Sequence, residues 1–206
     1  RRVIMSPRVQ IPKEKILETA LQLLIRDGYE AITIKAVAKE LGTSTQPISW
    51  TFGNMENFRT ALAEYALAYA NQKMHSDSYD SMEAYGKVGT GYVDMAYDEP
   101  NLIRFLRLDE KRLQGSGGLG GSFDEKAKAD RRKAFAGQYG CTEEEAEKFM
   151  LNMMIYTQGL VSMILAGGIN IAREDAHQLL HKMAGMMIRS FAKEKSMICE
   201  GEDKNA

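Results

Sequence analysis

The chain has 206 residues, of which 44% are hydrophobic, and its formal net charge is −1. That length and apolar content allow a substantial core in one or two domains. Ala, Leu, Met, Glu, Lys and Gln dominate, and no stretch alternates β-branched residues between hairpin turns, so we expect an all-α fold of about nine helices. Cys141 and Cys199 form neither a disulfide framework nor a metal-ligand pattern, and no signal peptide is recognisable, which indicates a cytoplasmic protein.

The small net charge hides an asymmetry between the two parts of the chain. Residues 1–60 carry nine Lys and Arg against six Asp and Glu, whereas residues 61–206 carry eighteen against twenty-two. A basic excess in one segment is what nucleic-acid binding requires, but this excess is modest. Affinity for DNA would have to come from a few phosphate contacts, doubled by a dimer, and not from a polycationic surface.

Residues 33–58 indicate two short helices joined by a turn that contains Gly42. Apolar residues of the first helix recur at i, i+3, i+4 and i+7, namely at Ile34, Val37, Ala38 and Leu41. The preceding segment, residues 11–28, also has apolar residues at helical spacing and ends at Gly28, where we expect αL geometry. The three helices would share one small core. In this order the last two form a helix-turn-helix, whose second helix enters a DNA major groove.

The helical pattern continues after this segment, and six further helices are expected. Their approximate bounds are 55–75, 82–97, 101–113, 123–139, 142–165 and 174–195, with a polar loop at 76–81 and a Gly-rich linker at 115–122. Asn54 is the expected N-cap of the first of them, and Asn57 stands where a capping box has Glu or Gln. Thr142 and Glu145 form a complete capping box. Pro100 suits the first turn of a helix, where amides lack an intrahelical partner in any case.

The uncharged run at residues 149–170 is long enough to be a transmembrane candidate, but its polar residues favour a buried helix and no membrane association. The last two expected helices carry enough apolar surface to pair with their own copies across a two-fold axis as a four-helix bundle. We therefore divide the chain into a helix-turn-helix DNA-binding domain at residues 1–54, a helical-bundle ligand-binding and dimerisation domain at 55–198, and a disordered tail at 199–206.

A specific set of residues stands at fixed spacing in the helix-turn-helix: Thr33, Val37, Ala38, Gly42, Ser44, Ile48, Phe52, Glu56 and Phe58. This set resembles the DNA-binding domain of the TetR family of bacterial transcription regulators. Residues 98–106 and 156–168 resemble stretches of the ligand-binding domain of that family, with Gln158 in place of a His. The resemblance implies an all-helical, dimeric regulator that binds an operator in double-stranded DNA and responds to a small molecule.

Three residues depart from the family pattern. Ser49 stands where the family usually has a Tyr that touches DNA phosphate, Met55 replaces a Lys, and Gln46 replaces a common Gly. Each lost charged contact removes about one unit of salt slope. We therefore expect operator binding that is weak, or that fails already at moderate salt, unless Arg1, Arg2, Arg8 and Lys13 compensate.

The expected DNA-facing residues lie at the start and on the groove side of the third helix. They are Thr43, Ser44, Thr45, Gln46, Ser49 and Trp50, joined by Thr33 as the cap of the second helix. Gln bonds to adenine, and Thr or Trp contacts a thymine methyl, which favours a half-site with A and T. Lys13, Lys35 and Lys39 are candidates for phosphate contacts. The alternatives are that these lysines are ordinary solvated side chains and that Trp50 packs on a neighbouring helix.

Aromatic and Met side chains of the later helices are candidates for the lining of an apolar effector cavity. They are Tyr65, Tyr69, Tyr92, Met95, Phe105, Met153 and Tyr156. The alternative for each one is that it belongs to the core, as Met and Tyr at helical spacing usually do.

Few residue patterns in the sequence suggest catalysis. His177 and His181 have a metal-compatible i, i+4 spacing but no evident third ligand, and no catalytic triad or carboxylate pair stands out. We expect no metal, no cofactor and no enzymatic activity. Besides an enzyme built in the C-terminal bundle, two further interpretations stay open. The first is a dimeric repressor released by a ligand, and the second is a helical ligand- or protein-binding module whose DNA binding has weakened.

Overall fold

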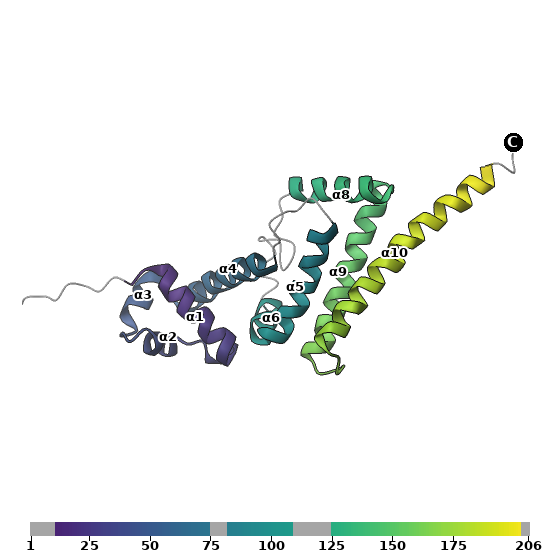
Figure 1. Cartoon of the computed structure of the whole chain (residues 1–206). Helices are drawn as coiled ribbons and strands as arrows, with labels where there is room; N and C mark the ends of the chain where they lie inside the picture. Colours follow the sequence, from purple (N-terminus) through teal and green to yellow (C-terminus); the bar gives the residue numbers. More distant parts are fainter. Residues whose placement is uncertain (1–10, 75–81, 109–124, 203–206) are drawn as a thin grey trace, which may run out of the picture. The chain divides into compact units, whose positions relative to one another are not determined.

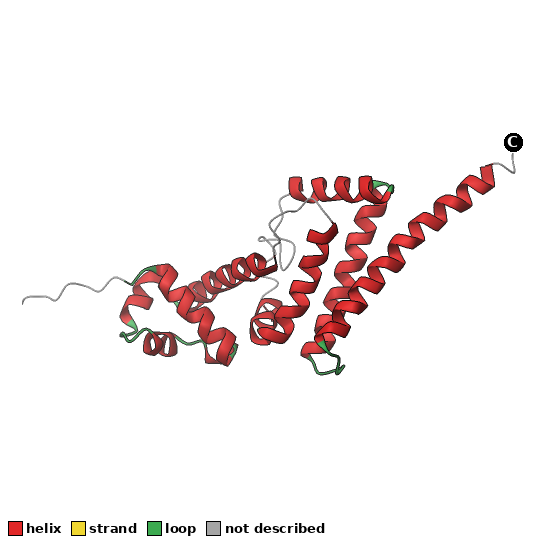
Figure 2. Cartoon of the chain, viewed as in Figure 1, coloured by secondary structure: helices red, strands yellow, loops and turns green. Residues whose placement is uncertain are grey.

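The computed structural model describes residues 11–74, 82–108 and 125–202. Within these ranges it contains nine α-helices, one 3₁₀ helix and no strand (Figure 1, Figure 2). The expected all-α fold is therefore confirmed. The elements in chain order are α1 (Lys13–Asp27), η1 (Tyr29–Ala31), α2 (Ile34–Glu40), α3 (Gln46–Phe52), α4 (Met55–Met74), α5 (Met82–Asp98), α6 (Pro100–Leu108), α8 (Glu125–Tyr139), α9 (Glu143–Leu165) and α10 (Arg173–Glu202).

Several helix ends differ from those that the sequence indicated. Gly28 has φ 85° and ψ 176°, so its φ is positive but the predicted αL geometry is wrong. The helix α10 continues through Glu202, beyond residue 198, because no proline interrupts it. The loop at 76–81, the linker at 115–122 and residues 203–206 of the expected tail lie outside the described residues.

The helices form two compact units, each of which is made of two separate segments of the chain. The first unit comprises residues 1–70 and 99–119, and the second comprises residues 71–98 and 120–206. The first therefore holds α1 to α3, most of α4, and α6, whereas the second holds α5, α8, α9 and α10. Packing thus assigns α6 to the same unit as the helix-turn-helix, and the functional boundary expected at residue 54 stays a prediction.

The core of the first unit is built where α1 meets α2, η1 and α6. Its completely buried side chains come from α1, α2, α3, α4 and α6: Ile16, Leu24, Val37, Ile48, Phe58, Leu62, Leu102 and Ile103. A polar contact adds to this packing, because the Asn101 side chain of α6 donates from Nδ2 to the carbonyl oxygen of Ile25 in α1 at 3.1 Å. That carbonyl is one of the last four of α1, which have no intrahelical partner.

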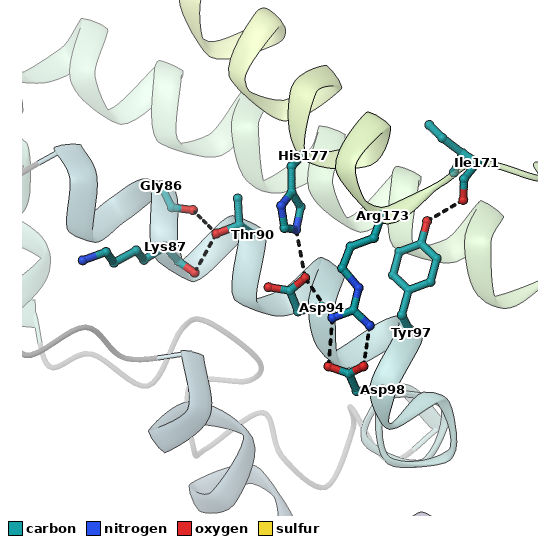
Figure 3. Close-up of polar contacts among 9 residues, drawn as sticks. All are labelled: Gly86, Lys87, Thr90, Asp94, Tyr97, Asp98, Ile171, Arg173 and His177. Atoms are coloured by element: carbon teal, nitrogen blue, oxygen red, sulfur yellow. Dashed lines mark hydrogen bonds and ion pairs between the residues drawn. The ribbon is translucent and has the colours of Figure 1, made fainter.

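The second unit is built around α9, which contacts α5, α8 and α10. Close approach is possible at Gly89 of α5, where an added Cβ would lie 3.8 Å from a Leu180 methyl and 3.9 Å from the Thr157 hydroxyl. Phe135 of α8 packs on Phe149 of α9 with ring centroids 4.5 Å apart. Polar side chains also join α5 to α10 and the loop before it, as when the Tyr97 hydroxyl donates to the Ile171 carbonyl at 2.9 Å (Figure 3).

The helix α9 begins as predicted, because the capping box of Thr142 and Glu145 is present on both sides. One face of it is buried, but the buried helix expected at residues 149–170 is only partly buried in the single chain. Large apolar side chains that remain exposed on it are Leu151, Met154, Ile155 and Met163, and α10 adds Leu179 and Met186. No described helix combines the length and apolar character needed to cross a bilayer.

Candidate nucleic-acid interface

The turn between α2 and α3 is set by local caps at both ends of α2. The Thr33 hydroxyl accepts a hydrogen bond from the Ala36 amide at 3.1 Å and so caps the N-terminus of α2. At the other end Gly42 adopts φ 64°, and the Thr43 amide donates to the Ala38 carbonyl at 2.9 Å. This is a Schellman turn, which closes a helix and redirects the chain within two residues. The predicted cap at Thr33 and the turn at Gly42 are thus both present.

The helix α3 has one buried and one exposed side. Ile48 is completely buried and Phe52 is 7% exposed, so both belong to the core of the first unit. Gln46 is exposed and the Trp50 side chain is 55% exposed. Of the other predicted DNA-facing residues, Ser44 and Thr45 are exposed, whereas Thr43 and Ser49 are half-buried. The resulting exposed surface is polar and aromatic, and it carries no charge of its own.

The end of α3 is joined to the start of α4 by Asn54 and Asn57. The Asn54 side chain accepts from the Asn57 amide at 2.8 Å, which confirms it as the N-cap. The Asn57 side chain does not complete a capping box; it donates from Nδ2 to the Phe52 carbonyl, the last of α3, at 3.0 Å. Gly53 between the two helices has φ 77°, a conformation that favours glycine. Phe52 and Phe58 pack edge to face beneath this turn, with centroids 5.0 Å apart.

Positive charge flanks the exposed side of the helix-turn-helix. Lys35 and Lys39 are exposed on α2. The Lys13 ammonium, at the start of α1, lies 5.9 Å from the centre of the Phe52 ring, and thus at the end of α3. The exposed acid of α2, Glu40, pairs with Arg26 of α1 at 2.7 Å. Lys13 thus lies beside α3, Lys35 and Lys39 lie exposed on the neighbouring α2, and the carboxylate of Glu40 is already paired with Arg26.

The Arg26 side chain has a structural role in the same unit. Besides Glu40 it bonds to its neighbour Asp27 through two nitrogens, at 2.9 and 2.8 Å. These hydrogen bonds hold the pKa of Asp27 below its usual range and raise that of Arg26 further above neutrality. Arg26 therefore joins α1 to α2 and is a poor candidate for a phosphate contact.

The residues predicted to bind a ligand are divided between the two units. Tyr65, Tyr69 and Phe105 belong to the first unit, and the Tyr69 hydroxyl donates to Glu99 at 2.9 Å. The others, which are Tyr92, Met95, Met153 and Tyr156, belong to the second unit. Tyr92, Met95 and Met153 are buried there. The Tyr92 hydroxyl donates at 2.9 Å to Oε1 of the half-buried Gln158, the residue that stands in place of the His in the resemblance.

Some contacts in the first unit have no signal in the sequence. Arg59 of α4 lies over the Tyr29 ring at 5.1 Å, and Tyr29 in turn stacks on Phe105 of α6 with centroids 5.3 Å apart. The Asn101 side chain beside Gly28 is another such contact. These residues are far apart in the chain, and no spacing pattern relates them.

The two histidines with metal-compatible spacing have separate surroundings. His177 Nε2 lies 2.9 Å from Asp94 Oδ1, whereas His181 is exposed (Figure 3 shows His177). Among the side chains that the structure describes, no three His, Cys, Asp or Glu gather as a metal site would require.

Residues 16–62 match a family model described as bacterial regulatory proteins, tetR family. Among solved structures, a TetR variant from Acinetobacter baumannii AYE in complex with minocycline is 17% identical, with a TM-score of 0.56 over 89% of this chain and 97% of that chain. A TetR-family transcriptional regulator from Streptomyces coelicolor is 18% identical, with a TM-score of 0.53 over 95% and 97%. A protein with unknown function from Rhodococcus sp. RHA1 is 14% identical, with a TM-score of 0.56 over 91% and 100%. At these identities the likeness concerns the fold. No curated protein matches the chain.

Proposed function

We propose that this chain is a homodimeric repressor, which a small apolar or aromatic molecule releases from its operator. It is a transcription regulator whose residues 16–62 form a TetR-family DNA-binding domain. The observation that carries the DNA-binding part is the orientation of α3. Its apolar residues Ile48 and Phe52 are buried, and Gln46 and Trp50 are exposed. A helix presented in this way can enter the major groove and contact base edges.

The contacts divide into base reading and backbone positioning. Gln46 and Trp50 are the proposed reading residues, with Thr45, Ser44, Thr43 and Ser49 beside them. Lys13, Lys35 and Lys39 are the proposed phosphate contacts. Because α3 itself has no charge, the affinity for DNA phosphates depends on these few lysines and on the presence of two copies. Binding should therefore weaken as the salt concentration rises.

Dimerisation is supported by the apolar side chains that α9 and α10 leave exposed. Leu151 and Ile155 are one helical turn apart and are 50% and 59% exposed. A second copy of the same two helices would bury this surface in a four-helix bundle. Two recognition helices held by such a dimer would meet half-sites about 34–36 Å apart, which is one turn of B-form DNA.

The proposed effector is a small apolar or aromatic molecule. The Acinetobacter baumannii protein of similar fold was solved in complex with minocycline. In the present chain, the candidate residues of the second unit are apolar or aromatic and include only the hydroxyls of Tyr92 and Tyr156 as polar groups. An effector that binds there is expected to be apolar or aromatic, with few hydrogen-bonding groups.

Selection of duplexes from a random library by the purified protein tests the DNA-binding part. We expect enrichment of an inverted repeat whose half-site centres are one helical turn, or a multiple of it, apart. The DNA upstream of the chain's own gene is the first natural duplex to try in gel retardation. If no sequence is enriched even at low salt, the chain is not a sequence-specific DNA-binding protein.

Thermal denaturation with a panel of apolar and aromatic compounds tests the effector. A ligand of the folded state raises the midpoint of unfolding in proportion to the logarithm of its excess over Kd. The same compound should release the selected duplex. A compound that stabilises the chain without releasing DNA would support ligand binding but contradict the repressor mechanism.

The second candidate function is a helical ligand- or protein-binding module with weakened DNA binding. It is favoured by Ser49 and Met55, which replace the Tyr and Lys that the family usually has in contact with phosphate. Under this alternative the library selection fails at every salt concentration, while compounds from the panel still shift the unfolding midpoint.

A further inference from the structure

The helix α3 is too short to be held in place by its own hydrogen bonds. It has seven residues, fewer than two turns. Isolated helices shorter than about 12–15 residues are marginal in water, so the direction of α3 depends on what fixes it at each end and beneath it. Ile48 and Phe52 fix its inner side. Its C-terminal end requires a separate attachment, because the last four carbonyls of any helix lack intrahelical partners.

Asn57 supplies that attachment from the first turn of α4. Its Nδ2 donates to the Phe52 carbonyl at 3.0 Å, while its own backbone amide is bound by the Asn54 side chain at 2.8 Å. The same side chain lies beside Gly53, where an added Cβ would be 3.8 Å from Nδ2. One residue thus joins the last carbonyl of α3 to a capped, well-fixed position in α4.

We infer that Asn57 is a positioning residue for DNA reading: its side-chain amide fixes the C-terminal end of α3 to α4 and so sets the angle at which Gln46 and Trp50 reach base edges. This inference rests on the proposed DNA-binding function and adds a residue that does not itself touch bases. Its amide hydrogens are the required feature, since a carbonyl can only accept. The role is therefore distinct from that of an ordinary residue in a helix first turn.

Replacement by Asp separates the two roles that position 57 can have. Asn57→Asp keeps the size of the side chain and places a negative charge in the first turn of α4, where the helix dipole favours it. The carboxylate cannot donate to the Phe52 carbonyl, and the partial negative charge at the end of α3 repels it. Stability of α4 is therefore retained while the attachment of α3 is lost.

The experiment compares the wild-type chain with Asn57→Asp, Asn57→Ala and a matched control, Thr60→Ala. Thr60 lies one turn further along α4 and donates to the Glu56 carbonyl at 3.1 Å, a bond that does not reach α3. For each protein the Kd is measured for the duplex selected by the wild type and for a scrambled duplex of equal length and composition. Thermal unfolding of each protein is recorded in parallel.

We expect both Asn57 variants to lose about tenfold in the ratio of specific to non-specific affinity, since a hydrogen bond of this kind is typically worth a factor of about three to ten and each protomer has one. Thr60→Ala should keep the wild-type ratio. The unfolding midpoint of Asn57→Asp should change little, because the favourable charge in the first turn of α4 offsets the lost hydrogen bond. The added charge alone would weaken both duplexes alike, because it acts on phosphates and not on base edges.

Amide hydrogen exchange gives a readout that needs no DNA. Loss of the attachment should speed exchange at the Phe52 and Gly53 amides in Asn57→Ala, without a change in α1. An unchanged affinity ratio in both Asn57 variants would overturn the inference and leave the proposed function intact. If the wild type itself does not discriminate between the duplexes, the proposed function and the reading role fail together. If the exchange rates of the Phe52 and Gly53 amides are then the same in the wild type and in Asn57→Ala, the attachment is absent as well.

Discussion

Arg173, the first residue of α10, donates through both terminal guanidinium nitrogens to the carboxylate of Asp98, the last residue of α5 (Figure 3). The Nη1–Oδ2 distance is 3.1 Å. A planar fork against a carboxylate is the strongest geometry that an ion pair takes in proteins. The same Nη1 lies 3.6 Å from Asp94, and Asp94 in turn contacts His177. Two carboxylates of α5 thus converge on the first turn of α10 and hold the two helices together.

This pair predicts a loss of stability in acid. Hydrogen bonding to Arg173 lowers the pKa of Asp98 in the folded chain. A group with a lowered folded pKa stabilises the fold above its ordinary pKa of about 4 and loses that contribution as pH falls through the folded value. The difference in unfolding midpoint between the wild type and Asp98→Asn should therefore be present at pH 6 and shrink below about pH 4.

The effect should be small, because the Asp98 side chain is 55% exposed and solvent screens the pair. Glu147→Gln, which removes an exposed acid of α9 beyond its first turn, serves as the control. A midpoint difference between the wild type and Asp98→Asn that stays constant from pH 6 to pH 3 would show that the pair does not stabilise the second unit.

Substitution of the reading residues should relax sequence preference. Gln46→Ala and Trp50→Ala each remove an exposed side chain, so the unfolding midpoint should change little. Discrimination between the selected duplex and single-base variants should fall by about 1–3 kcal/mol at the positions read. Gln22→Ala on the exposed side of α1 is the control. Trp50 is also the only Trp of the chain, so its fluorescence should change directly when the duplex binds.

The three lysines should behave differently from the reading residues. Lys13→Ala, Lys35→Ala and Lys39→Ala are expected to weaken binding to all sequences about equally, because phosphates carry no sequence information. Each should also reduce the slope of log Kd against log salt by about one unit. Lys133→Ala, on the exposed side of α8, should leave the slope as it is. A lysine whose loss leaves the slope unchanged is an ordinary solvated side chain.

The exposed apolar surface of α9 predicts a dimer that charge can dissociate. Ile155→Glu places a carboxylate at a side chain that is 59% exposed in the single chain but buried in the proposed four-helix bundle. Burial of an unpaired charge costs several kcal/mol, so the variant should be a monomer by analytical ultracentrifugation. Gln138→Glu, on exposed α8, adds the same charge and should remain dimeric. A monomeric wild type, at concentrations that support DNA binding, would contradict the proposed assembly.

The sequence by itself determined those features that depend on residues close together in the chain. The i, i+3, i+4 spacing located the helices, and the side chains that cap α2, α4 and α9 were predicted correctly because a cap involves residues only three apart. The exposed side of α3 followed from the same periodicity. The helix-turn-helix and its candidate reading residues are therefore consequences of local spacing alone.

Only the tertiary structure decided how distant segments combine. The bond from Asn101 to Ile25 and the pair of Arg173 with Asp98 join residues 76 and 75 positions apart, and no periodic pattern connects them. The same holds for the membership of α6 in the unit of the helix-turn-helix, and for the face of α9 that neighbouring helices leave uncovered. Prediction from spacing is limited even between close neighbours, as Asn57 shows. Its identity suggested an incomplete capping box, but the turn at Gly53 directs its side-chain amide to the end of α3. Spacing along one helix reports which residues share a face; the partner of that face depends on packing between helices, which sequence spacing does not encode.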